Sequence, residues 1–565
     1  MDFKFEIANA VAKAANIDVN EVFDAIEIPP DADLGDFSFP CFKLAKNLKK
    51  APPVIAAELM DGINDLDFVR RIAQTGAYLN FFIKRDAYAK AVLAKINLEG
   101  KNFGRSDIGG GGTIVIDYSH PNMAKPFHVG HLRSTVIGHA LYNIFNALGY
   151  RSFSINYLGD WGTQFGKVIA AYEKWGNEDD VKKGGIRELN RLYVKFHEEV
   201  DNGDKALDDV ARAWHNKMEA GDEYAMRLWQ WIKDISMEEY AKIYDLLGIS
   251  FDSYQGESYY NDKMEPVVQE LKDSGILKQD KGAWLVDLER FKMPPCLVLR
   301  SDGGTLYATR DITSALHRKS EYDFVKALYV TSHEQSLHFA QFFKVVELMG
   351  YDWAATQLLH VPFGYMNLPQ GKMSTRKGNV LLMEDLLEQT FEKITEIIDK
   401  KNPNLADKEN VAKQVGIGAI IFNDLYNSRI KDVEFSWERM LSFEGETGPY
   451  VQYTHARCCS VLGKATIGFD DADLSLLTSD EEFALIKILS TFPERIEEAA
   501  QKYEPFIISR FAMQCAQAFN KFYHENPILK ADEDLQEARL YLTDCTKTVI
   551  AAALKLIGIA APQEM

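Results

Sequence analysis

The feature that most restricts the fold is a polar segment that joins an apolar run to a helical pattern. Residues 113–116 (TIVI) predict a buried strand, and apolar residues at helical spacing over 132–148 predict a helix. The segment between them, residues 119–131, reads SHPNMAKPFHVGH. A strand that leads directly into a helix is the first unit of a doubly wound α/β sheet, so we expect a parallel-sheet domain to begin here.

The same segment predicts a phosphate site. N–H groups at a helix start are unpaired, and the helix dipole adds positive charge there, so an anionic phosphate is favoured. His128 and His131 can both reach such a phosphate, and Gly130 leaves room for a nucleotide. Lys125 adds a cation. The four residues 128–131 alone also fit a pair of surface histidines, but their place after a strand favours nucleotide chemistry.

A second cationic segment lies much later in the chain, at residues 371–379 (GKMSTRKGN). Cations and a hydroxyl between two glycines suit a loop that closes over a polyphosphate and stabilises the charge of a leaving pyrophosphate. By itself, such a segment is more often an exposed basic turn. The residues concerned are Lys372, Met373, Ser374, Arg376 and Lys377.

Together the two segments resemble the HIGH and KMSKS signatures of class I aminoacyl-tRNA synthetases. Four longer stretches look like arginyl-tRNA synthetase in particular: residues 119–133, 157–166, 450–457 and 556–562. This resemblance implies an enzyme for protein synthesis that ligates L-arginine to its cognate tRNA through an arginyl-adenylate. Arginine, tRNA and ATP are then its substrates, and Mg²⁺ accompanies ATP.

Composition is consistent with a large globular protein and argues against other classes. A chain of 565 residues is too long for a single hydrophobic core and implies several domains. Its apolar and charged fractions of 46% and 26% are ordinary for a soluble protein. No apolar run approaches the roughly 20 residues that span a bilayer, and charged residues near the N-terminus do not fit a signal peptide. The six cysteines include no C-x-x-C pair, so we expect reduced thiols in the cytoplasm and no zinc site.

The net charge of −19 argues against binding nucleic acid by bulk charge, although local phosphate contacts are compatible with it. One cluster of lysines near the N-terminus could make such contacts, and a solvated helix face explains it equally well. Its members are Lys43, Lys46, Lys49 and Lys50.

We expect four parts in the chain. Residues 1–108, which end at the glycines 109–112, form an α+β N-terminal domain that in the family touches the corner of the tRNA. Residues 109–166 and 292–395 form a doubly wound, Rossmann-type α/β catalytic domain, with later strands at 296–299, 327–330 and 358–361. Residues 167–291 form a helical connective insertion, and residues 396–565 form a C-terminal α-helical bundle that binds the anticodon. We expect a monomer.

The resemblance also assigns an arginine site. A planar guanidinium needs carboxylates in a fork arrangement. By resemblance, Tyr307 and Asp311 hold the substrate side chain, and Glu257 is the second carboxylate. The α-amino end and neighbouring groups are assigned to Asp117, Asn122 and Gln335. Without the resemblance, Asp311 is more simply explained as a helix cap.

Residues in both terminal domains are assigned to tRNA. Asn80 and Phe82 lie in the apolar run 78–83, for which a buried strand is the alternative. Tyr450, Tyr453 and Arg457 share one helical face that suits stacking on anticodon bases, although such a stripe is more often core. Met565 ends the chain where relatives also end at the RNA. Phe522 and Tyr523 are weaker candidates for the same surface.

In the implied reaction, the arginine carboxylate attacks the α-phosphorus of ATP, pyrophosphate leaves, and the arginyl group passes to the terminal adenosine of the tRNA. ATP is assigned to His128, Gly130, His131 and Met373, and catalysis to His128, His131, Lys125, Lys372, Ser374, Arg376 and Lys377. The fourth KMSKS position, normally lysine, is Thr375. Two other classes stay open: a nucleotidylyltransferase, and a tRNA-binding relative without catalysis.

Overall fold

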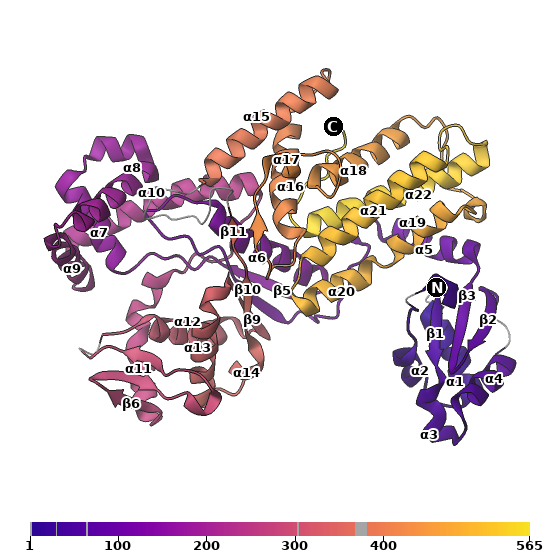
Figure 1. The fold of residues 1–565 in the computed structure, drawn as a ribbon, viewed down its shortest axis with the longest axis horizontal. Coiled ribbons are helices and arrows are strands. Elements are labelled where there is room, and N and C mark those ends of the chain that lie inside the picture. Colours follow the sequence, from indigo (N-terminus) through magenta and orange to yellow (C-terminus); the bar gives the residue numbers. More distant parts are fainter. Residues whose placement is uncertain (1–2, 30, 64–65, 302–303, 368–380) are drawn as a thin grey trace. The chain divides into compact units, whose positions relative to one another are not determined.

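The computed structural model describes residues 3–29, 31–63, 66–301, 304–367 and 381–565 (Figure 1). The chain divides into two compact units. The first unit comprises Met1–Phe103, Cys458–Thr491 and Gln517–Val549, and the second comprises Gly104–Arg457, Phe492–Ala516 and Ile550–Met565. We describe each unit by itself.

The first unit begins with an α+β arrangement, as predicted. Its sheet is antiparallel with the strand order β1-β3-β2, and the apolar run 78–83 forms the central strand. Apolar side chains of the sheet, including Leu79 and Phe81, share a buried core with those of α1, α2 and α4. The elements are α1 (Phe3–Ala15), α2 (Val19–Ala25), β1 (Phe37–Pro40), α3 (Ala45–Leu48), α4 (Pro52–Gly62), β2 (Val69–Thr75), β3 (Tyr78–Ile83) and α5 (Arg85–Glu99).

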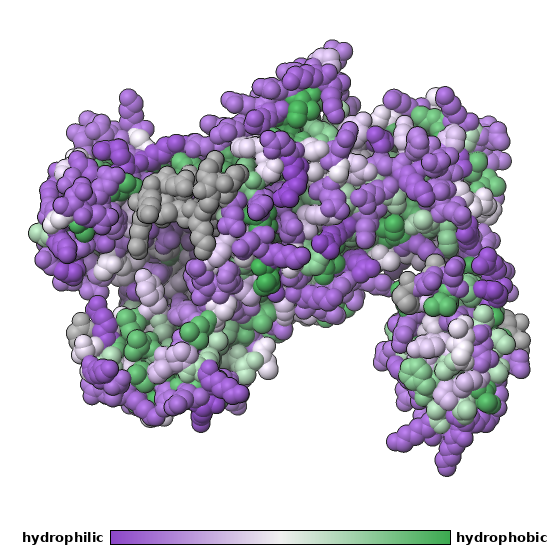
Figure 2. Space-filling model, in the orientation of Figure 1, coloured by the Kyte–Doolittle hydropathy of each residue, from purple (hydrophilic) through white to green (hydrophobic). Residues whose placement is uncertain are grey.

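The surface of this α+β part carries exposed apolar side chains. Figure 2 shows green and white areas on it, whereas the surface over the helices of residues 163–247 is mostly hydrophilic. Phe42 and Tyr78 are exposed and lie edge to face, with ring centroids 5.8 Å apart. Exposed aromatic rings of this kind are candidates for contact with a partner.

The second unit is built on a parallel sheet with the strand order β10-β9-β4-β5. All three neighbouring pairs in it are parallel. From β4 the chain passes through α6 to β5 on one side, and later returns to β9 on the other side (Figure 1). This order confirms the predicted doubly wound fold and places a topological switch point between β4 and β9. The elements are β4 (Thr113–Asp117), α6 (Val129–Ala147), β5 (Arg151–Ile155), β9 (Lys326–Ser332) and β10 (Leu358–Phe363).

The segment 296–299 is a strand, but the prediction that it completes the parallel sheet was wrong. β8 (Cys296–Leu299) pairs antiparallel with β7 (Ala283–Val286), which pairs antiparallel with β6 (Leu277–Asp280). Only residues 287–295 connect β7 to β8. Parallel neighbours need a crossover of a dozen or more residues, so this short connection favours an antiparallel hairpin.

Helices make up most of the remaining chain, as expected for the insertion and the C-terminal region. α7 (Thr163–Trp175) begins before residue 167, where the insertion was expected to start, and continues into it. The helices that lie within the insertion are α8 (Glu178–Asp201), α9 (Ala206–Glu219), α10 (Glu223–Leu247) and α11 (Met264–Asp273). Around β9 and β10 lie α12 (Tyr307–Tyr322), α13 (Ser336–Leu348) and α14 (Ala354–Gln357). The C-terminal helices are α15 (Met383–Lys401), α16 (Lys408–Leu425), α17 (Trp437–Met440), α18 (Gly448–Gly463), α19 (Asp480–Ser490), α20 (Phe492–Lys502), α21 (Phe506–Glu525) and α22 (Glu533–Leu556).

The six cysteines are free thiols, and five of them are buried. In the part of the chain that the structure describes, no helix has the length and apolar character that crossing a membrane requires. No group of three or more His, Cys, Asp or Glu side chains suited to a metal ion occurs among the described residues.

Candidate active site

A cavity of about 420 Å³ lies at the switch point of the parallel sheet. Its walls come from the carboxyl ends of β4 and β9, where doubly wound folds bind ligands. All six residues predicted to hold arginine line it, together with seven others. The lining residues are Asp117, His120, Asn122, Tyr157, Gly159, Glu257, Tyr307, Asp311, Tyr329, Thr331, Gln335, His338 and Phe339.

The predicted residues reach this cavity from separate parts of the chain. Asp117 is the last residue of β4, and Asn122 follows in the loop to α6. Glu257 begins a 3₁₀ helix, η4 (Glu257–Lys263). Tyr307 and Asp311 lie one turn apart in the first turns of α12, and Gln335 ends the 3₁₀ helix η6 (His333–Gln335) after β9. Tyr307 is 71% exposed, so its ring is accessible to a ligand.

Each of the three carboxylates in the cavity wall has a basic partner from within the chain. Asp117 Oδ2 accepts a hydrogen bond of 2.6 Å from Arg318 Nη1. Asp311 Oδ2 lies 2.6 Å from His338 Nε2, and Glu257 Oε2 lies 3.6 Å from Arg310 Nη1. The carboxylates are thus held in place before any ligand binds.

Burial raises the pKa of Glu257 to about 7, because its surroundings disfavour the charged form. Arg310 opposes this rise, and Asp311 and Asp160 add to it. A cation that enters the cavity therefore meets a carboxyl group that gives up its proton near neutral pH.

Two tyrosine rings line the cavity beside the guanidinium of Arg318. The Arg318 Cζ atom lies 5.1 Å from the ring centroid of Tyr157 and 5.6 Å from that of Tyr329. Burial raises the pKa of both phenols well above the ordinary value, so they stay neutral. Neutral aromatic faces beside carboxylates favour a planar cation.

The two histidines of the first motif lie stacked at the start of α6, with ring centroids 3.9 Å apart. His128 is the N-cap: its Nδ1 atom accepts from the Gly130 N–H at 3.0 Å. His131 Nδ1 accepts from the His128 N–H at 3.2 Å. Because each Nδ1 accepts a hydrogen bond, the ring proton of each neutral imidazole is on Nε2.

These imidazoles are neutral at physiological pH. Burial, with a smaller effect of Lys125, lowers the pKa of His128 to about 4. Burial also lowers the pKa of His131 well below its ordinary value. Two neutral Nε2–H donors beside a helix N-terminus can bind phosphate oxygens.

The loop before α6 has a constrained backbone that α10 holds in place. Ser119, His120 and Ala124 have positive φ angles of 84°, 54° and 61°. Tyr240 Oη donates to the carbonyl oxygens of Asn122 and Lys125 at 2.7 and 2.6 Å. Such backbone conformations cost energy and persist where the surrounding contacts determine them.

The predicted residues of the second motif, Lys372, Met373, Ser374, Thr375, Arg376 and Lys377, lie outside the described residues. The described chain on either side of this motif lies beside α6. Before it, Arg133 donates to the carbonyl oxygen of Tyr365 at 3.0 Å. β11 (Met366–Asn367) then pairs with β12 (Val433–Glu434). After it, Val129 N–H donates to Leu381 O at 3.2 Å, and Met383 N–H donates to Phe127 O at 2.9 Å.

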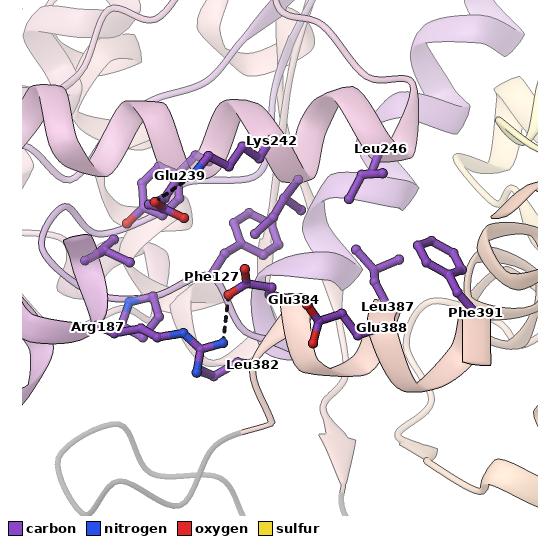
Figure 3. Close-up of a pocket in the computed structure, with 14 residues that line it drawn as sticks. Phe127, Arg187, Glu239, Lys242, Leu246, Leu382, Glu384, Leu387, Glu388 and Phe391 are labelled. Carbon is purple, nitrogen blue, oxygen red and sulfur yellow. Dashed lines mark hydrogen bonds and ion pairs between the residues drawn. The ribbon is translucent and has the colours of Figure 1, made fainter. Parts of the chain in front are cut away.

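A second cavity of about 210 Å³ lies between α8, α10 and the start of α15. It holds none of the predicted arginine-binding residues. Figure 3 shows Arg187 of α8 reaching Glu384 of α15, at 2.7 Å. Arg187 also pairs with Asp385 at 2.7 Å, so this side of the insertion is tied to the helix that follows the second motif.

The residues predicted to contact tRNA differ in exposure. Asn80 and Phe82 are 3% and 7% exposed. Ser38 Oγ donates to Asn80 Oδ1 at 2.6 Å, and the Arg71 guanidinium lies 4.0 Å from the Phe82 ring centroid. Both residues therefore occupy the buried strand that was the alternative explanation, and their contact with tRNA stays a prediction.

The C-terminal candidates lie mainly at the surface. On α18, Tyr453 is exposed, and the guanidinium of Arg457 lies 4.9 Å from its ring centroid, while Tyr450 is half-buried. The carbonyl oxygen of Met565 accepts from Asn402 Nδ2 at 3.3 Å. Phe522 is fully buried, so its prediction as a surface contact was wrong: α21 is amphipathic, and this position faces the core.

Sequence reasoning missed the basic partners of the carboxylates. Arg318 lies seven residues after Asp311, which is two turns along the same helix, and His338 lies three residues after Gln335. Both spacings place the basic residue on the face that carries the predicted one. This helical spacing could have identified both residues as neighbours of the site. The contact between Arg318 and the end of β4 could not be predicted, because it joins segments that are far apart in the sequence.

Three family models match the chain. The model described as tRNA synthetases class I (R), catalytic domain, matches residues 93–437. The DALR anticodon binding domain matches residues 451–565, and the arginyl tRNA synthetase N terminal domain matches residues 1–83.

Relatives that match over their whole length are arginine–tRNA ligases, which are also called arginyl-tRNA synthetases. The arginine–tRNA ligases of Alkaliphilus metalliredigens and Halothermothrix orenii are 52% and 50% identical to this chain over 566 and 567 residues, and each match covers 100% of both proteins. The solved structure of Thermus thermophilus arginyl-tRNA synthetase is similar with a TM-score of 0.83 at 27% identity, again over 100% of both chains.

Proposed function

The chain belongs to the arginyl-tRNA synthetase family, and from that premise we propose how its residues carry out the ligation of arginine to tRNA. ATP, arginine and tRNA are its substrates. The observation that supports the assignment best is the cavity in which three carboxylates and tyrosine rings lie at the switch point, beside a phosphate-binding helix start.

Arginine binds with its guanidinium toward Glu257, Asp311 and Tyr307. Two carboxylates can accept the planar fork of N–H donors, and the Tyr307 ring adds an aromatic face. A site built to pair this charge rejects uncharged analogues, because they leave Glu257 and Asp311 without the additional donors that a guanidinium supplies. Asp117, Asn122 and Gln335 hold the α-amino end and neighbouring groups.

ATP binds with its phosphates at the start of α6. His128 and His131 donate Nε2–H bonds to phosphate oxygens, and Gly130 allows the nucleotide to approach the backbone. Lys125, Lys372, Ser374, Arg376 and Lys377 stabilise the negative charge that develops on pyrophosphate, and Met373 contacts the nucleotide. Mg²⁺ enters as part of the ATP substrate, bound by phosphate oxygens.

The reaction needs no protein nucleophile. The arginine carboxylate attacks the α-phosphorus in line and expels pyrophosphate, and the arginyl group of the adenylate then passes to a ribose hydroxyl of the terminal adenosine. Positioning of two bound substrates and charge stabilisation supply the rate enhancement. Thr375 leaves the charge of the usual lysine to Arg376, Lys377 or Lys125.

Two surfaces contact tRNA. On α18, exposed Tyr453 with Arg457 and Tyr450 suits stacking on splayed anticodon bases. In the N-terminal part, the exposed rings of Phe42 and Tyr78 lie against each other, and Phe42 precedes Lys43 in the sequence. These rings are better placed to meet RNA than Asn80 and Phe82, whose contribution is to the strand beneath.

The molecule works as a cytoplasmic monomer with four domains. The boundaries that we propose are residues 1–108 for the N-terminal domain, 109–166 with 292–395 for catalysis, 167–291 for the insertion, and 396–565 for anticodon binding. No zinc takes part.

Pyrophosphate exchange with each of the twenty amino acids, with and without total tRNA, tests the function. We expect exchange with arginine alone and only when tRNA is present, because members of the family generally require tRNA to form the adenylate. Exchange with another amino acid would refute the specificity, and arginine exchange without tRNA would refute the coupling. Bound tRNA with no exchange at all would identify a tRNA-binding protein without catalysis.

A further inference from the structure

His338 lines the cavity but has no role in the function proposed so far. It lies in the first turn of α13, half-buried, with its ring centroid 5.6 Å from that of Phe339 and 5.4 Å from that of Phe342. These two rings restrict where the imidazole can lie. Its Nε2 atom points across the cavity wall to Asp311 Oδ2, at 2.6 Å. The contact joins α13 to α12.

The hydrogen bond occupies one oxygen of Asp311 and leaves the other for a ligand. Among the described residues, no hydrogen bond is formed to Asp311 Oδ1. A guanidinium has a rigid, planar set of donors, so its bond to a carboxylate depends on the orientation of that carboxylate. An aspartate whose second oxygen is held by a donor loses the freedom to rotate, and less entropy is lost when arginine binds.

We propose that His338 is a positioning residue for arginine: its Nε2–H group fixes the Asp311 carboxylate so that one oxygen faces the substrate guanidinium. This inference rests on the proposed function, because it assumes that Asp311 contacts arginine. In this proposal, His338 acts on arginine through Asp311 and has no role toward ATP or the reacting carboxylate. Its substitution should therefore raise the KM for arginine and leave kcat and the KM for ATP nearly unchanged.

Two conservative variants separate positioning from packing. In His338→Gln, the amide nitrogen can take the place of Nε2 and still donate to Asp311. In His338→Asn, the amide is one methylene shorter, and its nitrogen can replace only Nδ1. Both side chains are polar and suit a half-buried helix position, so folding is expected in both cases. We expect a KM for arginine within about threefold of wild type for the glutamine variant, and a rise of roughly tenfold or more for the asparagine variant.

His317→Ala is the matched control, because it removes an imidazole from α12 without altering the lining of the cavity. Aminoacylation of tRNA with arginine gives kcat and both KM values for all four proteins. Equal KM values for the glutamine and asparagine variants, or tighter arginine binding in either, would overturn the proposal. Wild-type protein that fails to charge tRNA with arginine would instead refute the proposed function.

Discussion

At the residue scale, the burial of Glu257 predicts that arginine binding depends on pH. Burial raises its pKa to about 7, so the free enzyme holds a proton on this carboxyl group below that pH. In the proposed function the arginine guanidinium lies beside Glu257 and favours the ionised form, so binding below pH 7 must release the proton. Arginine affinity is then fully developed above pH 7 and is lost as the pH falls.

We predict that the KM for arginine rises as the pH is lowered from 8 to 6, by up to about tenfold per pH unit below the pKa of Glu257. In Glu257→Gln, which cannot titrate, arginine binds more weakly and this dependence is absent. Aminoacylation kinetics from pH 6 to 8.5 measure both effects. Glu321→Gln, an exposed change on α12, should keep the wild-type profile. A flat profile in the wild type would contradict the prediction.

At the scale of a single element, His128 caps α6 with one ring nitrogen, and we propose that it binds phosphate with the other. Its Nδ1 atom caps α6 by accepting from Gly130 N–H, and its Nε2–H group is left for phosphate. A serine at this position can still act as an N-cap, but it is too short to replace Nε2.

We predict that His128→Ser unfolds at nearly the same denaturant concentration as wild type, whereas His128→Ala loses about 1 kcal/mol of stability. Both variants should lose pyrophosphate exchange by at least about tenfold, because both lack the donor to phosphate. Urea unfolding measures the first effect, and exchange with arginine and tRNA measures the second. Exchange retained by the serine variant would show that the cap is the main role of His128.

At the scale of the whole molecule, a buried ion pair joins distant parts of the second unit. Arg133 of α6 and Asp424 of α16 are each 1% exposed, with Arg133 Nε 3.4 Å from Asp424 Oδ2. Arg133 also donates to the carbonyl oxygens of Tyr365 and Lys431, at 3.0 and 2.8 Å. This one guanidinium thereby fixes the chain just before the second motif against the helix that carries the first.

We predict that Arg133→Met lowers the free energy of unfolding by about 3–5 kcal/mol, because it leaves the carboxyl group of Asp424 buried without its partner. The double variant Arg133→Met/Asp424→Leu should regain part of this loss, since it removes the stranded carboxylate. Urea unfolding of wild type, the single variant and the double variant measures the recovery. A double variant no more stable than the single one would show that the backbone hydrogen bonds of Arg133, and not the pair, carry the stability.

Local elements were predictable where the sequence pattern is strong. The strand at 113–117, the helix that follows it and the central strand at 78–83 all have apolar residues at the spacing of their structure. The predicted strand at 296–299 was also correct as an element, and only its sheet was wrong. Periodicity describes how one segment is buried, and it carries no information about which other strand lies beside it.

In the candidate site, too, some residues were predicted from the sequence and others were missed. Resemblance selected six of the thirteen residues that line the cavity, and the sequence alone predicted the strand-to-helix corner at which we propose that phosphate binds. The basic partners Arg318, Arg310 and His338 were missed. The burial of Phe522 was also missed, because an aromatic residue in an amphipathic helix fits either its core face or its exposed face.

The sequence by itself therefore determined the local elements and the residue types that the proposed chemistry requires, because these depend on neighbours a few positions apart. Only the tertiary structure decided which carboxylates pair with which cations, that the pKa of Glu257 lies near 7, and that His338 reaches Asp311. These properties arise from contacts between segments far apart in the chain. Burial and electrostatic energy depend on such contacts, and a local pattern does not encode them.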